Sequence, residues 1–335
     1  DMRFGRLLLS KHWASGLQFV SASGLVKGAS FEQFDASTIL PRGSYQLNSG
    51  KTLFSHESRV SRRLPGGGSW VVGINFVSDQ SVMGRSLTLR QGVRPVIGVT
   101  NVTRSGAVFG EATQPVTGRL WLTLGGRVTA ARVDGEPSIT PRSRNFVRGR
   151  STTRVDPTFG FSWALGGDWT AFGRYQSGFR TGGLAVAAGV GRVANFEADS
   201  IQMVEAGLRH VRRGATGLSA SVSLSHARWK AIQADLLNRS GQPVTSNIGD
   251  ARVDALEGWI EWVPQRDWHM TAAMFVTDNE VTGSTAALSR ASNHRLPETP
   301  SISARLGLVR DVSLGRDTVL STRGELAFVG PSVLG

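Results

Sequence analysis

Cysteine is absent from this chain of 335 residues, and long apolar runs are absent too. Without cysteine, the chain forms no disulfide and no cysteine-based metal site, although the absence fixes no cellular compartment. No stretch approaches the roughly 18 consecutive apolar residues of a membrane helix. The strands of a membrane β-barrel would escape that test, because their lipid-facing and lumen-facing residues alternate.

Lysine is scarce, and arginine carries almost the whole net charge of +13. A basic chain suggests nucleic-acid binding, but that function gathers its cations on one helix or stripe. Here the arginines are spread along the chain. The densest group is Arg142, Arg144, Arg148, Arg150 and Arg154, within one expected loop. We interpret this loop as a solvated segment that meets lipid phosphate or an acidic partner, and we expect no nucleic-acid partner.

Catalytic and metal-binding motifs are also missing. None of the six histidines pairs with another at metal-ligand spacing, and no G-x-S-x-G motif occurs. Ser225 and His226 are adjacent, but neighbouring residues of a strand point to opposite faces and cannot form a catalytic dyad. We therefore expect neither an enzyme nor a cofactor. A barrel enzyme would need a serine, a histidine and an acid converging in space.

What the chain does have is alternation of apolar and polar residues with a period of two. In residues 217–225, Leu218 and Val222 fall on one face and Ser219 and Ser223 on the other. About 14 such segments occur, and several exceed the mean length of about 5–6 residues for soluble strands. The pattern predicts an all-β protein with long antiparallel strands.

The connections between these segments alternate between short and long. The short ones are 11–16, 64–68, 115–119, 165–168, 212–217, 264–267 and 314–317. The long ones are 27–51, 79–102, 134–153, 180–199, 230–247 and 279–299. Tight turns on one rim and long loops on the other are typical of a transmembrane antiparallel β-barrel, with short periplasmic turns and long extracellular loops. An immunoglobulin-like sandwich would have turn signals every 8–12 residues.

The polar face of several segments carries charge. Glu257 and Glu261 share one strand face, and Arg127 and Arg323 lie on the polar faces of their own strands. In a large barrel the polar face lines a wet or plugged lumen. Tryptophans gather near segment ends, as in the aromatic girdle of membrane barrels. They are Trp13, Trp70, Trp121, Trp163, Trp169, Trp229, Trp262 and Trp268.

Residues 169–183 (WTAFGRYQSGFRTGG) resemble a recurrent strand and loop of TonB-dependent outer-membrane receptors. Further stretches follow in that family's order. They are 195–197 (NFE) with 205–208 (EAGL), 229–233 (WKAIQ), 247–251 (NIGDA) leading into 256–257 (LE), and 296–300 (LPETP). Upstream, 54–59 (FSHESR) and 107–113 (AVFGEAT) are similar to the family's earlier strands.

The resemblance implies a barrel of about 22 strands around an N-terminal plug, in the outer membrane of a Gram-negative bacterium. Such receptors bind scarce ligands, often ferric siderophores or cobalamin, and the inner-membrane TonB complex energises import. Here the plug, the TonB box and the last strands are missing. We therefore expect residues 1–335 to be a partial receptor barrel, with about 14 of the 22 strands.

The resemblance also implies three site candidates where loops meet the barrel rim: Arg180, Glu197 and Asn247. Their side chains contact ligand or plug, or they make hydrogen bonds that anchor the loops, which is the interpretation we favour. With Arg127, Glu257, Glu261 and Arg323 they complete the ligand- or plug-facing set. The expected function is TonB-dependent uptake of a scarce ligand. The alternative is a passive porin-like channel, which would lack a plug.

Overall fold

A computed structural model describes residues 1–35, 43–89, 92–143, 145–187, 191–237, 243–282, 294–315 and 317–332. Every regular element in these ranges is a β-strand. Within the same ranges, no helix has the length and apolar character needed to cross a bilayer.

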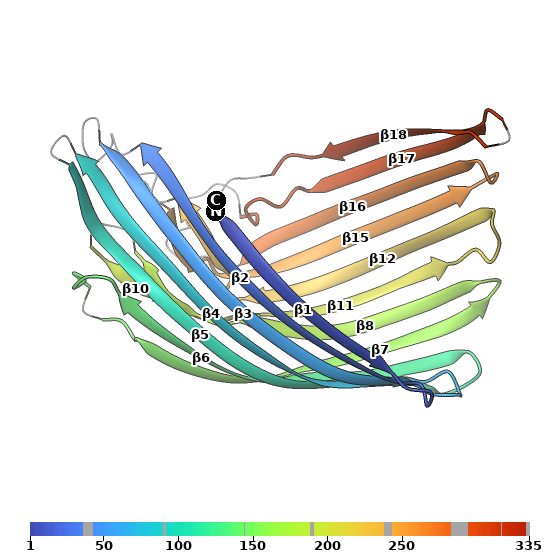
Figure 1. Ribbon diagram of the computed structural model, residues 1–335, viewed down its shortest axis with the longest axis horizontal. Coiled ribbons are helices and arrows are strands. Elements are labelled where there is room, and N and C mark those ends of the chain that lie inside the picture. Colours follow the sequence, from blue (N-terminus) through green and yellow to red (C-terminus); the bar gives the residue numbers. More distant parts are fainter. Residues whose placement is uncertain are drawn as a thin grey trace.

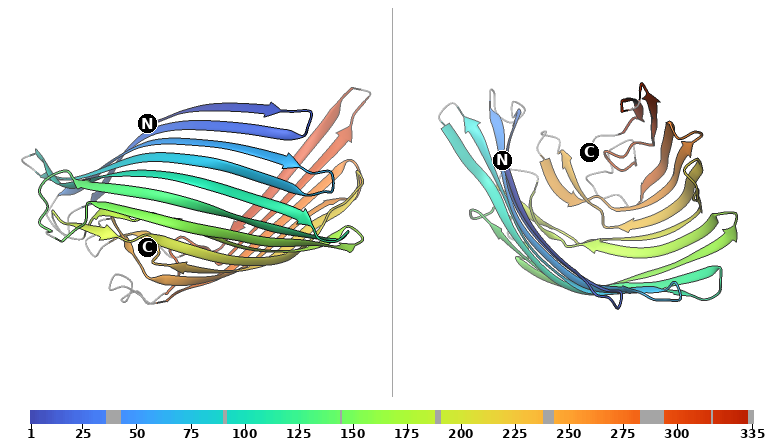
Figure 2. Two further views of the ribbon diagram at one scale, coloured as in Figure 1. Left: turned by 90° about the horizontal axis from the view of Figure 1, so that it is seen from below. Right: turned by 45° about the vertical axis from the view of Figure 1, so that its right-hand side comes forward.

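Fourteen strands form one antiparallel sheet in which spatial order follows chain order (Figure 1). They are β1 (Met2–His12), β2 (Leu17–Asp35), β3 (Ser44–Arg63), β4 (Ser69–Leu89), β5 (Gly92–Pro115), β6 (Leu120–Pro137), β7 (Gly149–Gly166), β8 (Trp169–Arg180), β11 (Asp199–His210), β12 (Gly217–Lys230), β15 (Asp250–Val263), β16 (Trp268–Thr282), β17 (Ile302–Ser313) and β18 (Val319–Val329). The predicted fold class is confirmed. In the described part of the chain, β1 and β18 are each paired on one side only, so the sheet is an open trough (Figure 2).

Four short strands make two hairpins outside the large sheet. The first joins β9 (Gly183–Val186) to β10 (Val193–Phe196), between β8 and β11. The second joins β13 (Gln233–Leu237) to β14 (Pro243–Asn247), between β12 and β15. We call the edge of the sheet that carries them the hairpin rim, and the opposite edge, where the tight connections lie, the turn rim.

All seven short connections are confirmed, because each lies between consecutive paired strands at the turn rim. Two of the long loops were predicted wrongly. Most of 27–51 and 79–102 is strand, because β2 continues to Asp35 and β4 to Leu89. The loop predicted over 134–153 is confirmed in a shorter form, since β6 ends at Pro137 and β7 begins at Gly149. The first hairpin covers the inner surface of β3 to β5 there and buries Tyr45, Leu87 and Ile97, whereas residues 29–33 of β2 stay exposed.

The trough has two chemically different faces. Ile74, Val108, Val128 and Val155 are successive cross-strand partners on β4 to β7, and each is about half exposed on the convex face. The neighbouring row, one residue along, contains Asn75, Ala107, Thr129 and Arg154 on the concave face. Cross-strand partners share a face, so the alternation read from the sequence runs in register across the sheet.

Several tryptophans lie at the turn rim as predicted. Trp163, Trp169 and Trp262 lie on the convex face close to tight turns and are 52%, 42% and 47% exposed. Trp229 is different, because it lies near the hairpin rim and its indole donates a hydrogen bond to Asp199. The predicted girdle therefore holds for part of the set, and Trp229 serves a local network instead.

A polar group formed by β2 and β3 lies on the convex face. His56 Nδ1 lies 2.9 Å from Ser23 Oγ and its Nε2 lies 3.1 Å from Ser58 Oγ. Ser58 in turn donates to Ser21 over 3.0 Å, while Phe54 and Phe76 pack beside the group. Because these polar atoms satisfy one another, they tolerate an apolar environment that would penalise any of them alone.

The two-faced sheet yields a test with adjacent residues. Leu224 lies mid-strand on the convex face of β12, and Ser223 lies on the concave face. In vesicles, Leu224→Arg should cost about 2–4 kcal/mol of folding free energy because the charge meets hydrocarbon. Ser223→Arg should cost much less, since carboxylates line the groove beside it. Urea titration of the intact protein in lipid measures both; equal losses would contradict this assignment of the faces.

Candidate functional site

The concave face of β4 to β7 is lined by polar groups that hold one another in place. Arg127 donates to Asn75 Oδ1 over 2.9 Å and to Thr129 Oγ1 over 3.1 Å, and its guanidinium lies over the Phe109 ring. Its cross-strand partner on β7 is the buried Asp156. The arginine predicted to face the lumen is therefore fixed in position on this face.

Ion pairs tie distant strands together across the trough. Arg174 on β8 pairs with Glu111 on β5 over 3.2 Å, spanning the two strands between them. Nearer the turn rim, Glu261 accepts from Arg212 over 2.9 Å, and His269 Nε2 lies 3.5 Å from the same carboxylate oxygen. The contact between Arg174 and Glu111 spans two strands because the concave curvature brings their side chains together.

Among the grooves of this face, two are lined by predicted site residues. One of about 590 Å³ is lined by Glu111, Arg127, Asp156 and Arg180, among others. The second, of about 660 Å³, is lined by Arg174, Glu205, Arg209, Glu257 and Glu261. Both therefore present fixed charge of both signs. Glu257 and Glu261 thus line one groove, as their shared strand face predicted.

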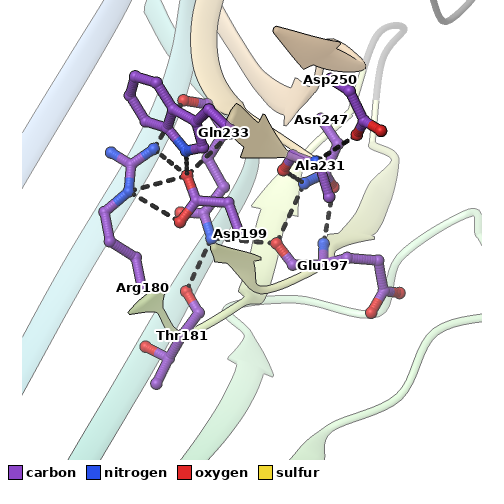
Figure 3. A network of polar contacts seen from close by, with 9 residues as sticks. Arg180, Thr181, Glu197, Asp199, Ala231, Gln233, Asn247 and Asp250 are labelled. Carbon is purple, nitrogen blue, oxygen red and sulfur yellow. Dashed lines mark hydrogen bonds and ion pairs between the residues drawn. The ribbon is translucent and has the colours of Figure 1, made fainter. Parts of the chain in front are cut away.

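At the hairpin rim, Asp199 is the centre of a network (Figure 3). Its side chain is 2% exposed and accepts both nitrogens of the Arg180 fork, with Nε 3.1 and 3.0 Å from the two carboxylate oxygens. Asp199 also accepts from the Trp229 indole and from the backbone N–H of Gln233. Arg180 lies 5.2 Å over the Trp229 ring. A carboxylate with so many donors is stable although it is buried.

Asn247 and Gln233 extend this network to the backbone. Asn247 Oδ1 accepts from the N–H of Glu197 over 2.7 Å, and its amide donates to the carbonyls of Glu197 and Ala231. The Gln233 amide donates to the carbonyls of Thr181 and Glu197, each over 3.0 Å. These bonds attach the second hairpin to the segments that flank the first.

The first hairpin also docks on the wall. Asn101 on β5 accepts from the N–H of Leu184 over 3.0 Å and donates to its carbonyl over 2.8 Å. Leu184, Val186 and Val193 pack into a buried cluster with Tyr45, Leu87, Val96, Ile97 and Val99. β9 also packs against β14, so the two hairpins form one layer over the concave face at the hairpin rim.

Arg85 and Tyr45 are buried beside this cluster, in the parts of β4 and β3 farthest from the turn rim. Burial raises the pKa of the Tyr45 phenol and lowers the pKa of the Arg85 guanidinium, while the attraction between the two groups opposes both shifts. The guanidinium lies 5.8 Å from the Tyr45 ring centroid. The phenol therefore stays neutral at physiological pH and is a fixed part of the hairpin support.

The structure places the predicted site residues in three groups. Arg127, Glu257 and Glu261 line the concave face. Arg180, Glu197 and Asn247 meet at the hairpin rim. There the side chains of Arg180 and Asn247 and the backbone of Glu197 connect the hairpins. The carboxylate of Glu197 is 67% exposed and pairs with Arg150 over 2.7 Å. Arg323 lies apart on β18, opposite Val309.

The sequence reasoning missed Asp199, Trp229, Gln233 and Asn101. For Asp199 a signal was available, because the predicted connection 180–199 ends on Arg180 and Asp199 themselves. Residues that close a connection between antiparallel strands stand opposite one another, and these two are cross-strand partners. An arginine and an aspartate at such positions predict an ion pair.

Ser225 and His226 lie on opposite faces, as predicted. Ser225 pairs across the strand with the concave Glu205, whereas His226 Nδ1 lies 2.7 Å from Asp254 on the convex face. In the described residues, no group of three or more histidine, aspartate or glutamate side chains could hold a metal ion.

Comparison with known proteins agrees with the geometry. Residues 6–324 match the family model described as TonB dependent receptor-like, β-barrel. No curated protein sequence matches the chain.

Among solved structures, the chain is similar to the ferric yersiniabactin uptake receptor FyuA from Yersinia pestis, with a TM-score of 0.79 and 16% identity over 99% of this chain and 50% of that one. It is also similar to BauA, the ferric preacinetobactin receptor from Acinetobacter baumannii, with a TM-score of 0.68 and 15% identity over 98% of this chain and 52% of that one. A third similar structure is the copper transporter OprC, with a TM-score of 0.68 and 15% identity over 92% of this chain and 50% of that one. The chain thus spans about half the length of these structures, and identities this low establish the fold alone.

The rim network gives a matched pair of variants. Asp199→Asn keeps the side-chain size but removes the charge that holds Arg180, and should lower the local stability of the hairpins by about 1.5–3 kcal/mol. Glu197→Gln removes only the exposed pair with Arg150 and should cost about 0–1 kcal/mol. Hydrogen exchange at the Gln233 and Leu184 amides reads the difference; equal effects would refute the central role of Asp199.

Proposed function

The chain belongs to the TonB-dependent receptor family through its β-barrel domain, and on that premise we propose that it forms part of the wall of an outer-membrane uptake receptor. In this proposal, residues 1–335 are a partial barrel whose concave face surrounds a plug supplied by the rest of the receptor. The receptor imports a scarce ligand such as a ferric siderophore, and the inner-membrane TonB complex supplies the energy. The protein would lie in the outer membrane of a Gram-negative bacterium.

The observation that carries the proposal is the contrast between the two faces of one sheet. The convex face exposes a band of valine, isoleucine and leucine side chains, while the concave face presents fixed charges of both signs. A soluble sheet of this size would bury the apolar face and expose the polar one. Lipid outside and a hydrated lumen inside reverse that arrangement.

The orientation follows from the two rims. Tight connections are periplasmic in such barrels and the longer ones are extracellular. The turn rim would then face the periplasm, and the hairpin layer held by Asp199 and Asn101 would face the outside. Ligands arriving from outside would first meet that layer and the groove below it, which Arg127 and Arg180 line.

The concave charges that make no salt bridge with described residues of the wall suit plug contact. Arg127 is bonded only to neutral groups, and Glu257 and Arg323 form no salt bridge in the part of the chain that the structure describes. Glu261 already pairs with Arg212 and His269, so it would contribute less to contact with the plug. A plug surface with complementary charges would pair with the first three.

The similar structures do not identify the ligand. Their descriptions name ferric yersiniabactin, ferric preacinetobactin and copper as cargo. The cargo named for all three contains a metal, either iron or copper. We propose a ferric chelate for this chain, because ferric siderophore receptors are the more frequent of these neighbours.

Energy coupling separates this proposal from a passive channel. Cells that produce the intact protein as their sole iron receptor should accumulate radioactive iron from catecholate, hydroxamate or phenolate siderophores. A protonophore should abolish that uptake, because the TonB complex draws on the inner-membrane potential. Uptake that continues at the same rate with the protonophore would establish the porin-like alternative, and no uptake from any of the three would reject the ferric chelate.

Plug contact can be measured without a ligand. The intact protein in a planar bilayer should pass almost no steady current, since a plug fills the lumen. Glu257→Arg should raise the conductance several-fold by repelling the facing plug surface. Asp317→Arg makes the same charge change within the tight connection 314–317 and should have no effect. A wild-type protein that conducts continuously would overturn the proposed plug.

A further inference from the structure

The convex face carries a row of four polar side chains on adjacent strands. Ser78 on β4 pairs across the strand with Arg104 on β5, Arg104 pairs with Arg132 on β6, and Arg132 pairs with Ser151 on β7. Both arginines and Ser151 are exposed. Cross-strand partners share a face and lie about 5 Å apart, so the row presents hydroxyl, guanidinium, guanidinium and hydroxyl side by side.

The two arginines are directly opposite each other, which is an unfavourable arrangement for like charges. Arg132 pairs with Asp134 over 2.9 Å, and the same carboxylate attracts Arg104 without forming a salt bridge with it. The two guanidinium groups thus share one described carboxylate, so the row keeps one excess positive charge, flanked by two hydroxyl donors.

The height of the row on the wall locates it relative to a membrane. Arg104 and Arg132 each lie about 11 residues along their strands from the turn rim, and about 9–11 tilted residues cross the hydrocarbon core. Toward the turn rim the convex face becomes apolar. The next outward-facing pair is Gly106 with Ala130, and the pair after that is Val108 with Val128. The row thus stands where hydrocarbon gives way to headgroups on the side of the hairpin rim.

We propose that Ser78, Arg104, Arg132 and Ser151 bind the phosphate of a phosphorylated lipid headgroup in the outer leaflet. A phosphate oxyanion between the two guanidinium groups would relieve their repulsion and accept charge-assisted bonds from both, and the serine hydroxyls would donate to its remaining oxygens. The net charge of +13 favours an anionic surface as the partner. The inference rests on the proposed membrane setting of the convex face, but not on the ligand or the plug.

A second arginine pair on the same face acts as an internal control. Arg228 on β12 and Arg252 on β15 are also cross-strand partners at about the same height, about 11 residues from the turn rim. Their surroundings are different, because Arg252 pairs with Asp254 over 3.2 Å and with Glu280 over 3.8 Å. The next partner along that row is the carboxylate of Glu280 rather than a hydroxyl. This pair is neutralised by the protein and should not retain a phosphate.

The test uses the intact protein in phosphatidylcholine vesicles doped with phosphatidic acid, a phosphomonoester lipid, or with diacylglycerol, which lacks the phosphate. Native mass spectrometry of the released protein counts the retained lipid. Wild type should retain phosphatidic acid and not diacylglycerol. Arg104→Gln should reduce retention about tenfold, as expected for losing a charge-assisted contact. Arg104→Lys should keep part of it, and Arg228→Gln should change it less than about twofold.

Three outcomes would overturn the proposal. Equal retention by Arg104→Gln and wild type would show that the row does not bind the headgroup. An equal loss in Arg228→Gln would show that any convex arginine attracts the lipid. Displacement of the lipid by millimolar inorganic phosphate would indicate a site for the free anion.

Loss of folding is separated from loss of binding by the diacylglycerol vesicles. There, Arg104→Gln should be at least as resistant to urea as wild type, since it removes a like-charge contact. Destabilisation in those vesicles would also contradict the inference. Loss of energy-coupled uptake would bear on the proposed function alone, since this row lies on the opposite face from the groove.

Discussion

Everything in this structure depends on the need of backbone N–H and C=O groups for partners where no water is available to supply them. A sheet meets that need through its neighbours, strand by strand, and leaves side chains as the only contact with either solvent. Successive residues of a strand point to opposite faces, so the position of a residue in its strand decides whether its side chain faces lipid or lumen. The rows from Ile74 to Val155 and from Asn75 to Arg154 are the result, held in register across β4 to β7. The polar atoms of His56 on the convex face are paired locally with serine hydroxyl groups.

Much of this was predictable because the signal is local. Parity within a segment assigned Leu224 and Ser223 to opposite faces, and turn residues placed all seven tight connections. The parts of β2 to β6 nearest the hairpin rim were not predictable in the same way. Tyr45, Leu87 and Ile97 become strand residues with a dry inner side only because Leu184 and Val186, far along the chain, cover them. A pattern within one segment contains no information about such a cover.

The rim residues show the same division. Arg180 and Asn247 were recognised by resemblance, yet their partners follow from register: Asp199 faces Arg180 because β8 and β11 pair, and Asn247 reaches Glu197 because two separate hairpins meet. The polar chemistry at the outer edge is thus largely structural, and it positions the hairpin layer above grooves lined by charges of both signs. The network at the rim thus fixes the position of the hairpin layer over the concave surface.

The strand order of the large sheet has a consequence beyond binding. Every strand pairs with the next one in the chain, apart from the two places where a small hairpin is inserted between partners. Adding or deleting one up-and-down pair would leave the register of all the others unchanged. A pair of consecutive strands of the large sheet is therefore the unit by which such a wall can grow in evolution. Duplication of one pair can enlarge the circumference by two strands without changes in the surrounding sequence. Proteins built in this way can diverge in size and cargo while the rule that assigns each residue to a face stays the same.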